Sequence, residues 1–494
     1  MTEDDIRYRA VQAKDARFDG WFFVAVTSTG IYCRPSCASV IPGRARVRFY
    51  PTAAAAQRAG FRACKRCRPD ASPGSPEWDR RNDAVARAMR AIADGVVDRE
   101  GVRGLATRLG YSTRQLGRLL ISEVGAGPLE LARAQRAQTA RILLETTSLR
   151  ASEVAFAAGF GSVRQFNDTV RQIFAETPTA LRRRVERAVG QPEPGSVNLR
   201  LAFRPPLATT LLFAFLAARA VPGVEEGDAT YHRRALRLPY GAAVVTVLAP
   251  SPGQNYVQAQ LALDDLRDLT TAAKRVRQML DLDADPASVS EVLGSDAVLM
   301  DAIATRPGLR VPGHVDGEEL AVRALLGQQV SVTGARSLAG RLAARHGHPL
   351  ARPHGAVLRN FPAPAVLGCL NAEDLPVPVS RARAIVDLSR AIAEGKLDLR
   401  PGTDRDEVSR RLLAIHGLGP WTVAYVRMRA LADPDAFPGE DLALRRALAG
   451  AGLPTSPAAL AQRARAWRPY RAYACQYLWS GALGRTEAHE GRVA

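Results

Sequence analysis

The sequence predicts a multidomain, mostly α-helical protein with a small zinc-bound α/β domain at its N-terminus. Three observations predict this fold class. The chain has 494 residues, which is too long for one ordinary core. Four of its six cysteines lie within 35 positions near the start. Apolar residues recur at helical spacing over most of the remaining chain, except for a strand-like segment from about residue 197 to residue 263.

Segments rich in proline and glycine separate the predicted domains. "RPDASPGSPEW" (68–78) and "VGQPEPGSV" (189–197) both have the composition of linkers. We therefore expect four domains: a zinc-binding domain over 1–75, a double helix-turn-helix over 80–187, a small α+β domain over 197–300 and an all-α domain over 301–490.

Basic residues outnumber acidic ones. The chain has 68 Lys and Arg against 49 Asp and Glu, and the first 190 residues alone carry 32 basic and 19 acidic residues. Such an excess favours an anionic partner, usually nucleic acid, although an Arg-rich composition from a GC-rich gene would also produce it. The polar start and the lack of a long apolar run predict no signal peptide and no membrane partner. We expect a monomer in the cytoplasm, associated with the nucleoid.

The clustered cysteines have the spacing of a metal site. Cys33, Cys37, Cys64 and Cys67 form the pattern C-x3-C…C-x2-C, and four soft thiolates suit tetrahedral Zn²⁺. The simpler interpretation is a zinc ion that only stabilises a small domain. From Arg34 to Arg68, however, the sequence has nine Lys or Arg and no Asp or Glu. This cationic setting favours a DNA-binding role, with Arg34 as a contact residue.

The same region resembles a known family. "FFVAVTSTGIYCRPSCASV" and "GFRACKRCRPD" are similar to the N-terminal zinc domain of Ada-type DNA-repair proteins, over roughly residues 5–75. In that family the first ligand accepts a methyl group from a methyl phosphotriester in DNA. The resemblance implies that Cys33 is this nucleophile. Zinc keeps a thiol deprotonated, and methylation would reduce the negative charge of the site, so DNA affinity should then rise.

Two segments in the helical middle repeat one plan. "VRGLATRLGYSTRQLGRLL" (102–120) and "ASEVAFAAGFGSVRQFNDTVRQIF" (151–174) both read as helix, turn, helix. Gly110 and Gly159 allow the turns, and Ser112 can cap the helix that follows. A helix over Pro128–Leu144 could hold the two units in successive major grooves.

This tandem arrangement resembles an AraC-type DNA-binding domain, which follows the zinc domain in Ada-type proteins as well. The resemblance implies that the second helix of each unit contacts DNA. A solvated surface remains the alternative for each residue. The candidate contacts are Arg114, Gln115, Arg118, Arg164, Gln165 and Asn167.

A glycine-rich turn marks the C-terminal half. In "LLAIHGLGPWTVAYVRMRAL" (412–431) we expect a helix to end at His416 and a new one to begin at Pro420. Gly417 and Gly419 form the hairpin between them, whose backbone N–H groups can hold a DNA phosphate. A glycine turn between helices is common, so this feature alone is a moderate signal.

Three further segments strengthen the signal from this glycine turn: "AFPGEDLALRRAL", "LAVRALLGQQVSV" (320–332) and "WRPYRAYACQYLW" (467–479). With the hairpin, they resemble the AlkA-type helix-hairpin-helix glycosylases, which excise alkylated purines such as 3-methyladenine, over about residues 197–486. The resemblance implies that Asp441 is catalytic. It implies that Gln329 stands where the family places a wedge, a role for which leucine would be easier, and that the base pocket contains Trp421, Tyr425 and Trp479.

Each of these residues also has a structural interpretation. Asp441 could cap the helix "LALRRAL", and the aromatic residues could belong to the core. Relatives that also cut the DNA strand have a lysine where Trp421 stands. The resemblance therefore implies a monofunctional glycosylase that hydrolyses the N-glycosyl bond and leaves the strand intact.

The leading hypothesis is a bifunctional protein that accepts methyl groups on Cys33, excises alkylated purines with Asp441 and activates transcription. One alternative is a regulator only, whose C-terminal half is a non-catalytic DNA clamp; another is a repair enzyme only. The expected partners are double-stranded alkylated DNA, promoter DNA and RNA polymerase. Cys369 and Cys475 lack the Pro-Cys-His setting of guanine methyltransferases, so we expect no repair of O6-methylguanine. We expect both cysteines to be buried packing residues.

Overall fold

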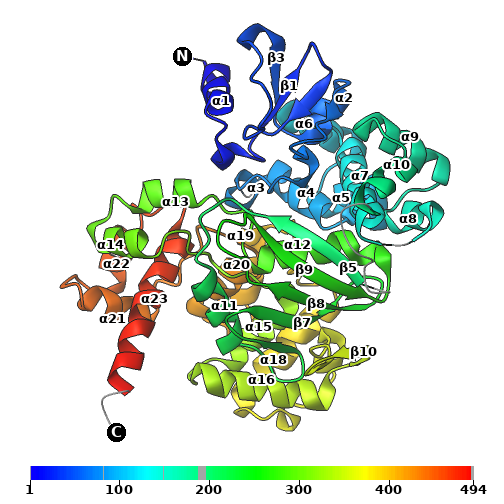
Figure 1. The fold of residues 1–494 in the computed structure, drawn as a ribbon. Helices are drawn as coiled ribbons and strands as arrows, with labels where there is room; N and C mark the ends of the chain where they lie inside the picture. The colour runs from blue at the N-terminus through cyan, green and yellow to red at the C-terminus, as the bar shows by residue number, and fades with distance from the viewer. Residues whose placement is uncertain (1, 82, 148, 187–195, 491–494) are drawn as a thin grey trace. The chain divides into compact units, whose positions relative to one another are not determined.

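A computed structural model describes residues 2–81, 83–147, 149–186 and 196–490. The chain, coloured by residue number in Figure 1, divides into two compact units. The first contains residues 1–204 and 236–277, and the second contains residues 205–235 and 278–494. The four predicted domains stay a prediction, and most of the predicted linker at 189–197 lies outside the described residues. No helix among the described residues is long and apolar enough to cross a membrane.

The N-terminal part of the first unit is a small α/β domain. Its four strands are arranged in the order β3-β1-β2-β4, with β2 and β4 parallel and the other pairs antiparallel. The apolar core of this domain surrounds the four cysteines. The elements are α1 (Glu3–Gln12), β1 (Phe23–Val26), β2 (Ile31–Cys33), β3 (Val47–Tyr50), α2 (Ala53–Arg58) and β4 (Arg62–Ala63).

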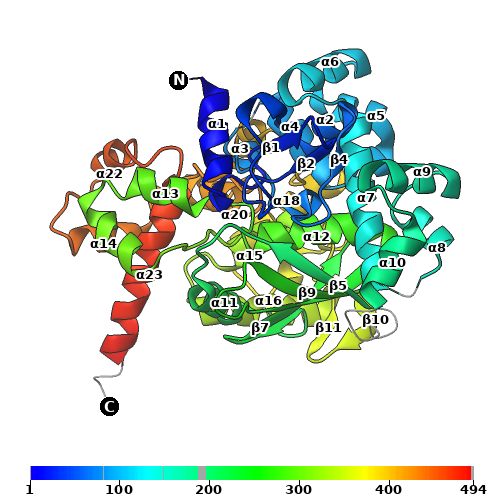
Figure 2. The same cartoon turned by 45° about the horizontal axis from the view of Figure 1, so that its top comes forward.

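The helical middle contains the two predicted helix-turn-helix units, which Figure 2 shows around α7. Gly110 and Gly159 both adopt positive φ angles, +77° and +84°, as the turns require. Ser112 caps α6, as predicted, by accepting the N–H of Gln115. The helices are α3 (Glu77–Arg80), α4 (Ala84–Ala93), α5 (Val96–Leu109), α6 (Thr113–Val124), α7 (Pro128–Thr146), α8 (Ala151–Ala157), α9 (Val163–Phe174) and α10 (Pro178–Glu186).

The first residues of segment 68–78, the predicted linker, pack against α7. Arg68 pairs with Glu145 at 2.5 Å, and Asp70 pairs with Arg141 at 3.0 Å, both on α7. The side chains of Asp70 and Arg141 are nearly inaccessible to solvent. The start of this segment is therefore anchored to α7, and its role as a linker stays a prediction.

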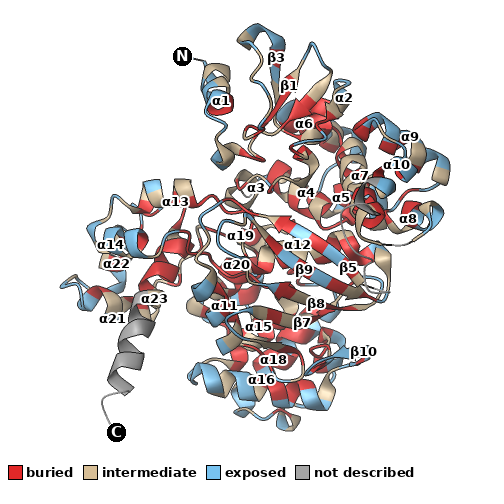
Figure 3. Cartoon of the chain, in the orientation of Figure 1, coloured by how far each residue is buried: buried red, intermediate tan, exposed pale blue. Residues whose placement is uncertain are grey.

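The strand-like segment forms strands, as predicted, with a helix near Leu211. In the first unit β9 pairs antiparallel with both β5 and β8. Residues along β5 and β9 alternate between buried and exposed, which Figure 3 shows in red and blue, because one face of these strands is covered. In the second unit β6 pairs antiparallel with β7. The elements are β5 (Ser196–Ala202), α11 (Thr209–Ala218), β6 (Glu225–Gly227), β7 (Tyr231–Arg237), β8 (Ala242–Leu248), β9 (Tyr256–Leu263) and α12 (Leu269–Met279).

The rest of the second unit, over the residues that the structure describes, is mainly helical, as predicted, with one short hairpin of strands. An apolar core joins α13, α14 and α20 to α23, with Trp467 fully buried in it. The helices are α13 (Pro286–Leu293), α14 (Ala297–Thr305), α15 (Gly317–Leu326), α16 (Val332–His346), α17 (Pro364–Leu367), α18 (Val379–Ala393), α19 (Arg405–Leu413), α20 (Pro420–Arg429), α21 (Leu442–Ala449), α22 (Pro457–Arg463) and α23 (Arg471–Glu490).

Three details of the C-terminal half differ from expectation. The hairpin consists of β10 (Pro349–His354) and β11 (Val357–Arg359), which the helical pattern did not predict because Pro, His and Gly give no strand signal there. Helix α19 ends at Leu413 rather than at His416, because the chain leaves the helix before the glycine turn. Cys475 is buried, as expected, but Cys369 is exposed.

Candidate functional sites

The four cysteines come together where β2 and β4 end. These strands pair in parallel, with Ile31 opposite Arg62 and Tyr32 opposite Ala63. Cys33 closes β2 and Cys64 follows β4, so the register brings one cysteine of each pair to the same end of the sheet. The backbone N–H of Cys64 donates to the carbonyl of Tyr32 at 3.0 Å, which fixes this arrangement.

The four sulfur atoms fit a zinc ion. They lie within 4.8 Å of one another, and all four residues are buried. A tetrahedral ion with Zn–S bonds of about 2.3 Å needs sulfur atoms about 3.8 Å apart. The site is therefore a four-cysteine metal centre of the zinc type. The exposed fractions of the four cysteines are all between 6% and 9%, so burial does not distinguish Cys33 from the other three.

A buried carboxylate orders the loop between the first two ligands. Asp19 accepts hydrogen bonds from the backbone N–H of Ser36 at 3.0 Å and from its hydroxyl at 2.6 Å. Burial raises the pKa of Asp19, while the Ser36 donors and the charge of Arg34 oppose this rise. Arg34 lies 3.4 Å from Asp19 and keeps a third of its side chain exposed. Arg34, the predicted DNA contact, is thus accessible to solvent, and its ion pair with the buried Asp19 orients its side chain.

The predicted helix-turn-helix contacts lie on α6 and α9. Arg114, Gln115 and Arg118 are exposed on α6, while Arg164 and Gln165 are exposed on α9. Asn167 is only partly exposed. The two glutamines have a second role that the sequence did not reveal. The side-chain carbonyl of Gln115 accepts the N–H of Ser112, and that of Gln165 accepts the N–H of Gly161. Each amide group is therefore positioned at the start of its helix.

In the second unit, Asp441 is held by two tryptophans that are far from it in sequence. The indole N–H of Trp421 on α20 donates to Oδ2 of Asp441 at 2.8 Å. The indole N–H of Trp479 on α23 donates to Oδ1 at 3.0 Å. Asp441 is also the N-cap of α21, since Oδ1 accepts the N–H of Leu444 at 2.9 Å. Both interpretations of this residue are therefore compatible, because capping orients the carboxylate.

Two of the three predicted pocket aromatics hold this carboxylate, and the third stacks on one of them. The rings of Trp421 and Tyr425 are stacked, with centroids 5.3 Å apart and planes 9° from parallel. Trp421, Tyr425, Trp479 and Asp441 all remain partly exposed. Burial opposes ionisation of Tyr425, but the positive charges of Arg429 and Arg219 outweigh it and lower the pKa of this phenol. The arrangement offers a flat aromatic wall beside an oriented anionic group, which suits a positively charged planar ligand.

The hairpin and the predicted wedge are linked by a residue that sequence reasoning missed. Gly417 is exposed with a φ of +92°, and Gly419 is exposed at the start of α20. Gln329 is exposed between α15 and α16, also with a positive φ of +56°. Its neighbour Gln328 donates from Nε2 to the carbonyl of Gly417 at 3.1 Å and to the Thr422 hydroxyl at 3.0 Å. A glutamine pair in the sequence gave no sign of which one would make this link.

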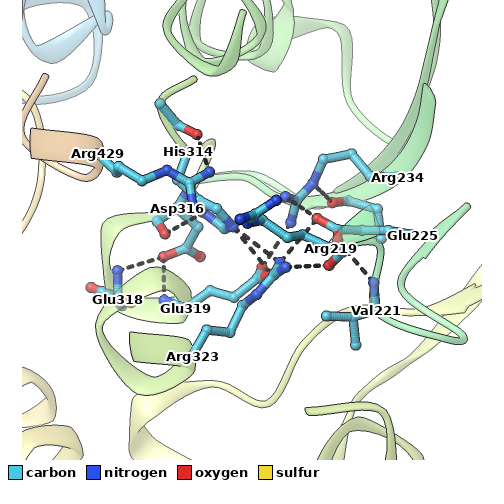
Figure 4. Close-up of polar contacts among 12 residues, drawn as sticks. Arg219, Val221, Glu225, Arg234, His314, Asp316, Glu318, Glu319, Arg323 and Arg429 are labelled. Atoms are coloured by element: carbon cyan, nitrogen blue, oxygen red, sulfur yellow. Dashed lines mark hydrogen bonds and ion pairs between the residues drawn. The ribbon is translucent and has the colours of Figure 1, made fainter. Parts of the chain in front are cut away.

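A buried charge network lies in the same unit (Figure 4). Arg234 pairs with Glu225 at 2.6 Å and with Glu319 at 2.8 Å. Arg323 pairs with the same two carboxylates at 3.1 Å and 2.9 Å. It also donates to the backbone carbonyl of Arg219 at 2.7 Å. The network joins β6 and β7 to α15, which leads directly into the loop that carries Gln328 and Gln329.

Glu225, His314 and Glu319 are close enough together to hold a metal ion, but their surroundings do not fit one. The guanidinium groups of the buried Arg234 and the partly buried Arg323 already neutralise the two carboxylates. A divalent cation would add uncompensated charge to a buried site, which costs several kcal/mol. We therefore assign this cluster a structural role.

Family models match three parts of the chain. Residues 6–70 match the metal binding domain of Ada, residues 105–184 match a helix-turn-helix domain, and residues 198–316 match the AlkA N-terminal domain. These segments are those whose motifs resembled the zinc domain, the AraC-type domain and the α+β domain.

Curated relatives cover both halves. The "Probable bifunctional transcriptional activator/DNA repair enzyme AlkA" of Mycobacterium tuberculosis is 54% identical over 96% of this chain and 95% of its own length. "DNA-3-methyladenine glycosylase 2" of Escherichia coli is 31% identical over 56% of this chain and 95% of its own length. The "Bifunctional transcriptional activator/DNA repair enzyme Ada" of Escherichia coli is 36% identical over 28% of this chain and 38% of its own length. The chain thus belongs to the AlkA family of bifunctional transcriptional activators and DNA repair enzymes, in which an Ada-type metal domain and a helix-turn-helix domain precede an AlkA-type glycosylase region.

Proposed function

We propose that this protein repairs two kinds of alkylation damage in DNA with two separate groups, Cys33 and Asp441. Cys33 accepts methyl groups from methyl phosphotriesters, and Asp441 drives hydrolysis of the N-glycosyl bond of alkylated purines such as 3-methyladenine. The observation that carries the second activity is the carboxylate of Asp441, oriented by two indole N–H groups beside a stacked aromatic wall.

The methyl transfer follows from the chemistry of the four-cysteine site. Bound zinc would keep the Cys33 sulfur deprotonated and hence nucleophilic. The sulfur attacks the methyl carbon; an S–C bond forms and the C–O bond breaks, with its electron pair leaving on the phosphodiester. Because the thioether is stable, each molecule accepts one methyl group. The loss of negative charge at the metal site reduces repulsion from DNA phosphates and strengthens binding, while Arg34 contacts the backbone.

Base excision needs little acid catalysis, because a purine alkylated on a ring nitrogen is already positively charged. The glycosyl bond breaks with its electron pair leaving on the base, and the sugar develops positive charge. The carboxylate of Asp441 stabilises this charge and directs a water molecule to C1′. Trp421, Tyr425 and Trp479 stack against the extruded base, and Gln329 fills the space that it leaves. Gly417 and Gly419 hold the DNA backbone through the hairpin N–H groups.

The methylated protein binds promoter DNA through its two helix-turn-helix units. Arg114, Gln115 and Arg118 contact one major groove, and Arg164, Gln165 and Asn167 contact the next. Bound there as a monomer, the protein recruits RNA polymerase. Its substrate is double-stranded DNA and its thiols must stay reduced, so we place it in the cytoplasm at the nucleoid.

One experiment tests both activities together. The full-length protein is incubated with methylated DNA, and released bases and protein-bound methyl are measured in the same sample. Asp441→Asn should lose base release and keep methyl uptake, whereas Cys33→Ala should do the reverse. A regulator with a non-catalytic clamp would release no bases even as wild type. A repair enzyme without regulation would protect no promoter in footprinting, with or without methylation of Cys33.

A further inference from the structure

The aromatic wall of the pocket is backed by a buried positive charge. Trp421, Tyr425 and Arg429 follow one another at four-residue spacing along α20, so they lie on one face of the helix. Nη1 of Arg429 donates to the hydroxyl of Tyr425 at 2.5 Å. Since Tyr425 stacks on Trp421, and Trp421 holds Asp441, only two residues separate Arg429 from the catalytic carboxylate.

Arg429 is rigidly held by hydrogen bonds to uncharged groups. It is only 7% exposed, and its other donors reach the backbone carbonyls of Pro312 at 2.7 Å and Gly313 at 3.3 Å. Its guanidinium carbon lies 4.8 Å from the ring centre of Phe215 and 5.4 Å from that of Tyr425. Among the described residues no carboxylate pairs with it, in contrast to Arg234 and Arg323 close by, which share two. Figure 4 shows all three side chains.

A second cation adds to this charge. The guanidinium carbon of Arg219 lies 3.8 Å from the ring centre of Phe215, and its charge also acts on the phenol of Tyr425. A buried cation without a counter-charge destabilises the fold, so the buried Arg429 needs a functional reason, and the partly buried Arg219 adds its charge to the same side of the wall. The aromatic rings themselves have the opposite effect on a cationic base, because electron-rich rings attract cations.

We propose that Arg429, supported by Arg219, is a specificity-determining positioning residue that holds Tyr425 in place and offsets the attraction of the aromatic wall for positively charged bases. This inference rests on the proposed glycosylase function. With the guanidinium groups present, the pocket does not select its bases on charge alone, and neutral damaged purines compete with cationic ones. At an effective dielectric constant of about 20, a unit charge about 10 Å away changes such a preference roughly tenfold.

The test compares two DNA duplexes, one with a single 7-methylguanine, which is cationic, and one with a single hypoxanthine, which is neutral. For each full-length variant the ratio of kcat/KM on the first duplex to kcat/KM on the second is measured. Arg429→Gln should raise this ratio about tenfold relative to wild type. Arg429→Lys keeps the charge and should leave the ratio within about twofold, even if both rates fall. Arg446→Gln, which removes an exposed charge from α21, is the matched control and should leave the ratio unchanged.

Several outcomes would overturn the inference. An unchanged ratio in Arg429→Gln, or an equal rise in Arg429→Lys, would show that the charge does not set the preference. If Arg429→Gln fails to fold, Arg219→Gln is measured instead. It should raise the ratio by a smaller factor, and an unchanged ratio would again contradict the inference. Wild type that releases 7-methylguanine but no hypoxanthine selects on charge alone and contradicts the inference. Wild type that releases neither base refutes the proposed glycosylase function itself.

Discussion

The four-cysteine site and the Asp441 site are built in opposite ways. The four thiols lie within 35 positions of sequence, on strand ends whose register brings them together. Asp441 instead depends on Trp421, 20 residues before it, and on Trp479, 38 residues after it, each on a different helix. The first site is a local ligand set that needs a metal ion to complete it. The second is assembled by helix packing and completed by the protein's own N–H donors. The two sites belong to different compact units, so we expect that each can be damaged without loss of the other.

The largest expected effect is the loss of metal from one site alone. Cys64→Ser removes one thiolate, and a structural zinc ion contributes about 10 kcal/mol or more to its domain. We expect the purified variant to contain almost no zinc and to accept no methyl groups, while its base release stays near that of wild type. Metal content is measured by atomic emission. The control is Cys369→Ser, which changes an exposed cysteine outside the cluster. A parallel loss of base release would mean that the two sites depend on each other.

The next effect tests the indole donors at the other site. Trp421→Phe keeps a ring that can stack on Tyr425 but removes the N–H that reaches Oδ2 of Asp441. A hydrogen bond to a charged group contributes about 1.5–3 kcal/mol, so kcat for base release should fall roughly tenfold to a hundredfold. Methyl uptake should not change. Single-turnover rates in wild type, Trp421→Phe and Trp479→Phe would measure this, and a rate equal to wild type in both variants would contradict the orienting role.

Acid should lower the stability of the second unit through a residue outside both sites. His232 is buried beside the Glu225 network, and neither of its ring nitrogens has a hydrogen-bond partner among the described residues. Burial lowers its pKa to about 4, against an ordinary value of 6.5. The unfolded chain therefore binds a proton more readily, so stability is unaffected above about pH 6.5 and falls as the pH drops towards 4, by about 1.4 kcal/mol for each pH unit.

Replacing His232 should flatten this pH dependence. In His232→Leu we expect the difference in melting temperature between pH 7.5 and pH 5.5, followed by tryptophan fluorescence, to be smaller than in wild type. The exposed His416 provides a matched control, because His416→Leu should leave the pH dependence unchanged. A wild-type difference that survives in His232→Leu would assign the acid sensitivity to other groups, such as the buried His314, whose pKa burial also lowers.

The smallest expected effect concerns the link between the hairpin and the wedge loop. Gln328→Ala removes the two hydrogen bonds to Gly417 and Thr422 but leaves the pocket intact. Each such neutral bond contributes about 1 kcal/mol. We expect KM for damaged DNA to rise about threefold to tenfold with little change in kcat. Gln329→Ala should instead lower kcat if Gln329 fills the space left by the base. Equal effects of both variants on kcat would remove the distinction between the two glutamines.

Features of the fold and of the four-cysteine cluster could be predicted where the signal is local. The cysteine spacing, the cap at Ser112 and the turn glycines each act through neighbours only a few residues away, so the sequence carries them directly. The contacts of Gln328, the exposure of Cys369 and the packing of Asp70 against Arg141 depend on segments that are distant in sequence. Arg429 looked like any helix arginine, because the sequence does not show that its hydrogen-bond partners in the packed structure are uncharged groups.

The parallel pairing of β2 with β4 has a consequence for assembly of the zinc domain. Side chains of a strand alternate between faces, so a slip of one residue would turn Cys33 and Cys64 away from each other. A two-residue strand such as β4 offers few backbone bonds to prevent that slip. Zinc binding should therefore select the correct register of this pairing. A newly made chain without zinc should populate misaligned strands rather than an empty but correctly folded site.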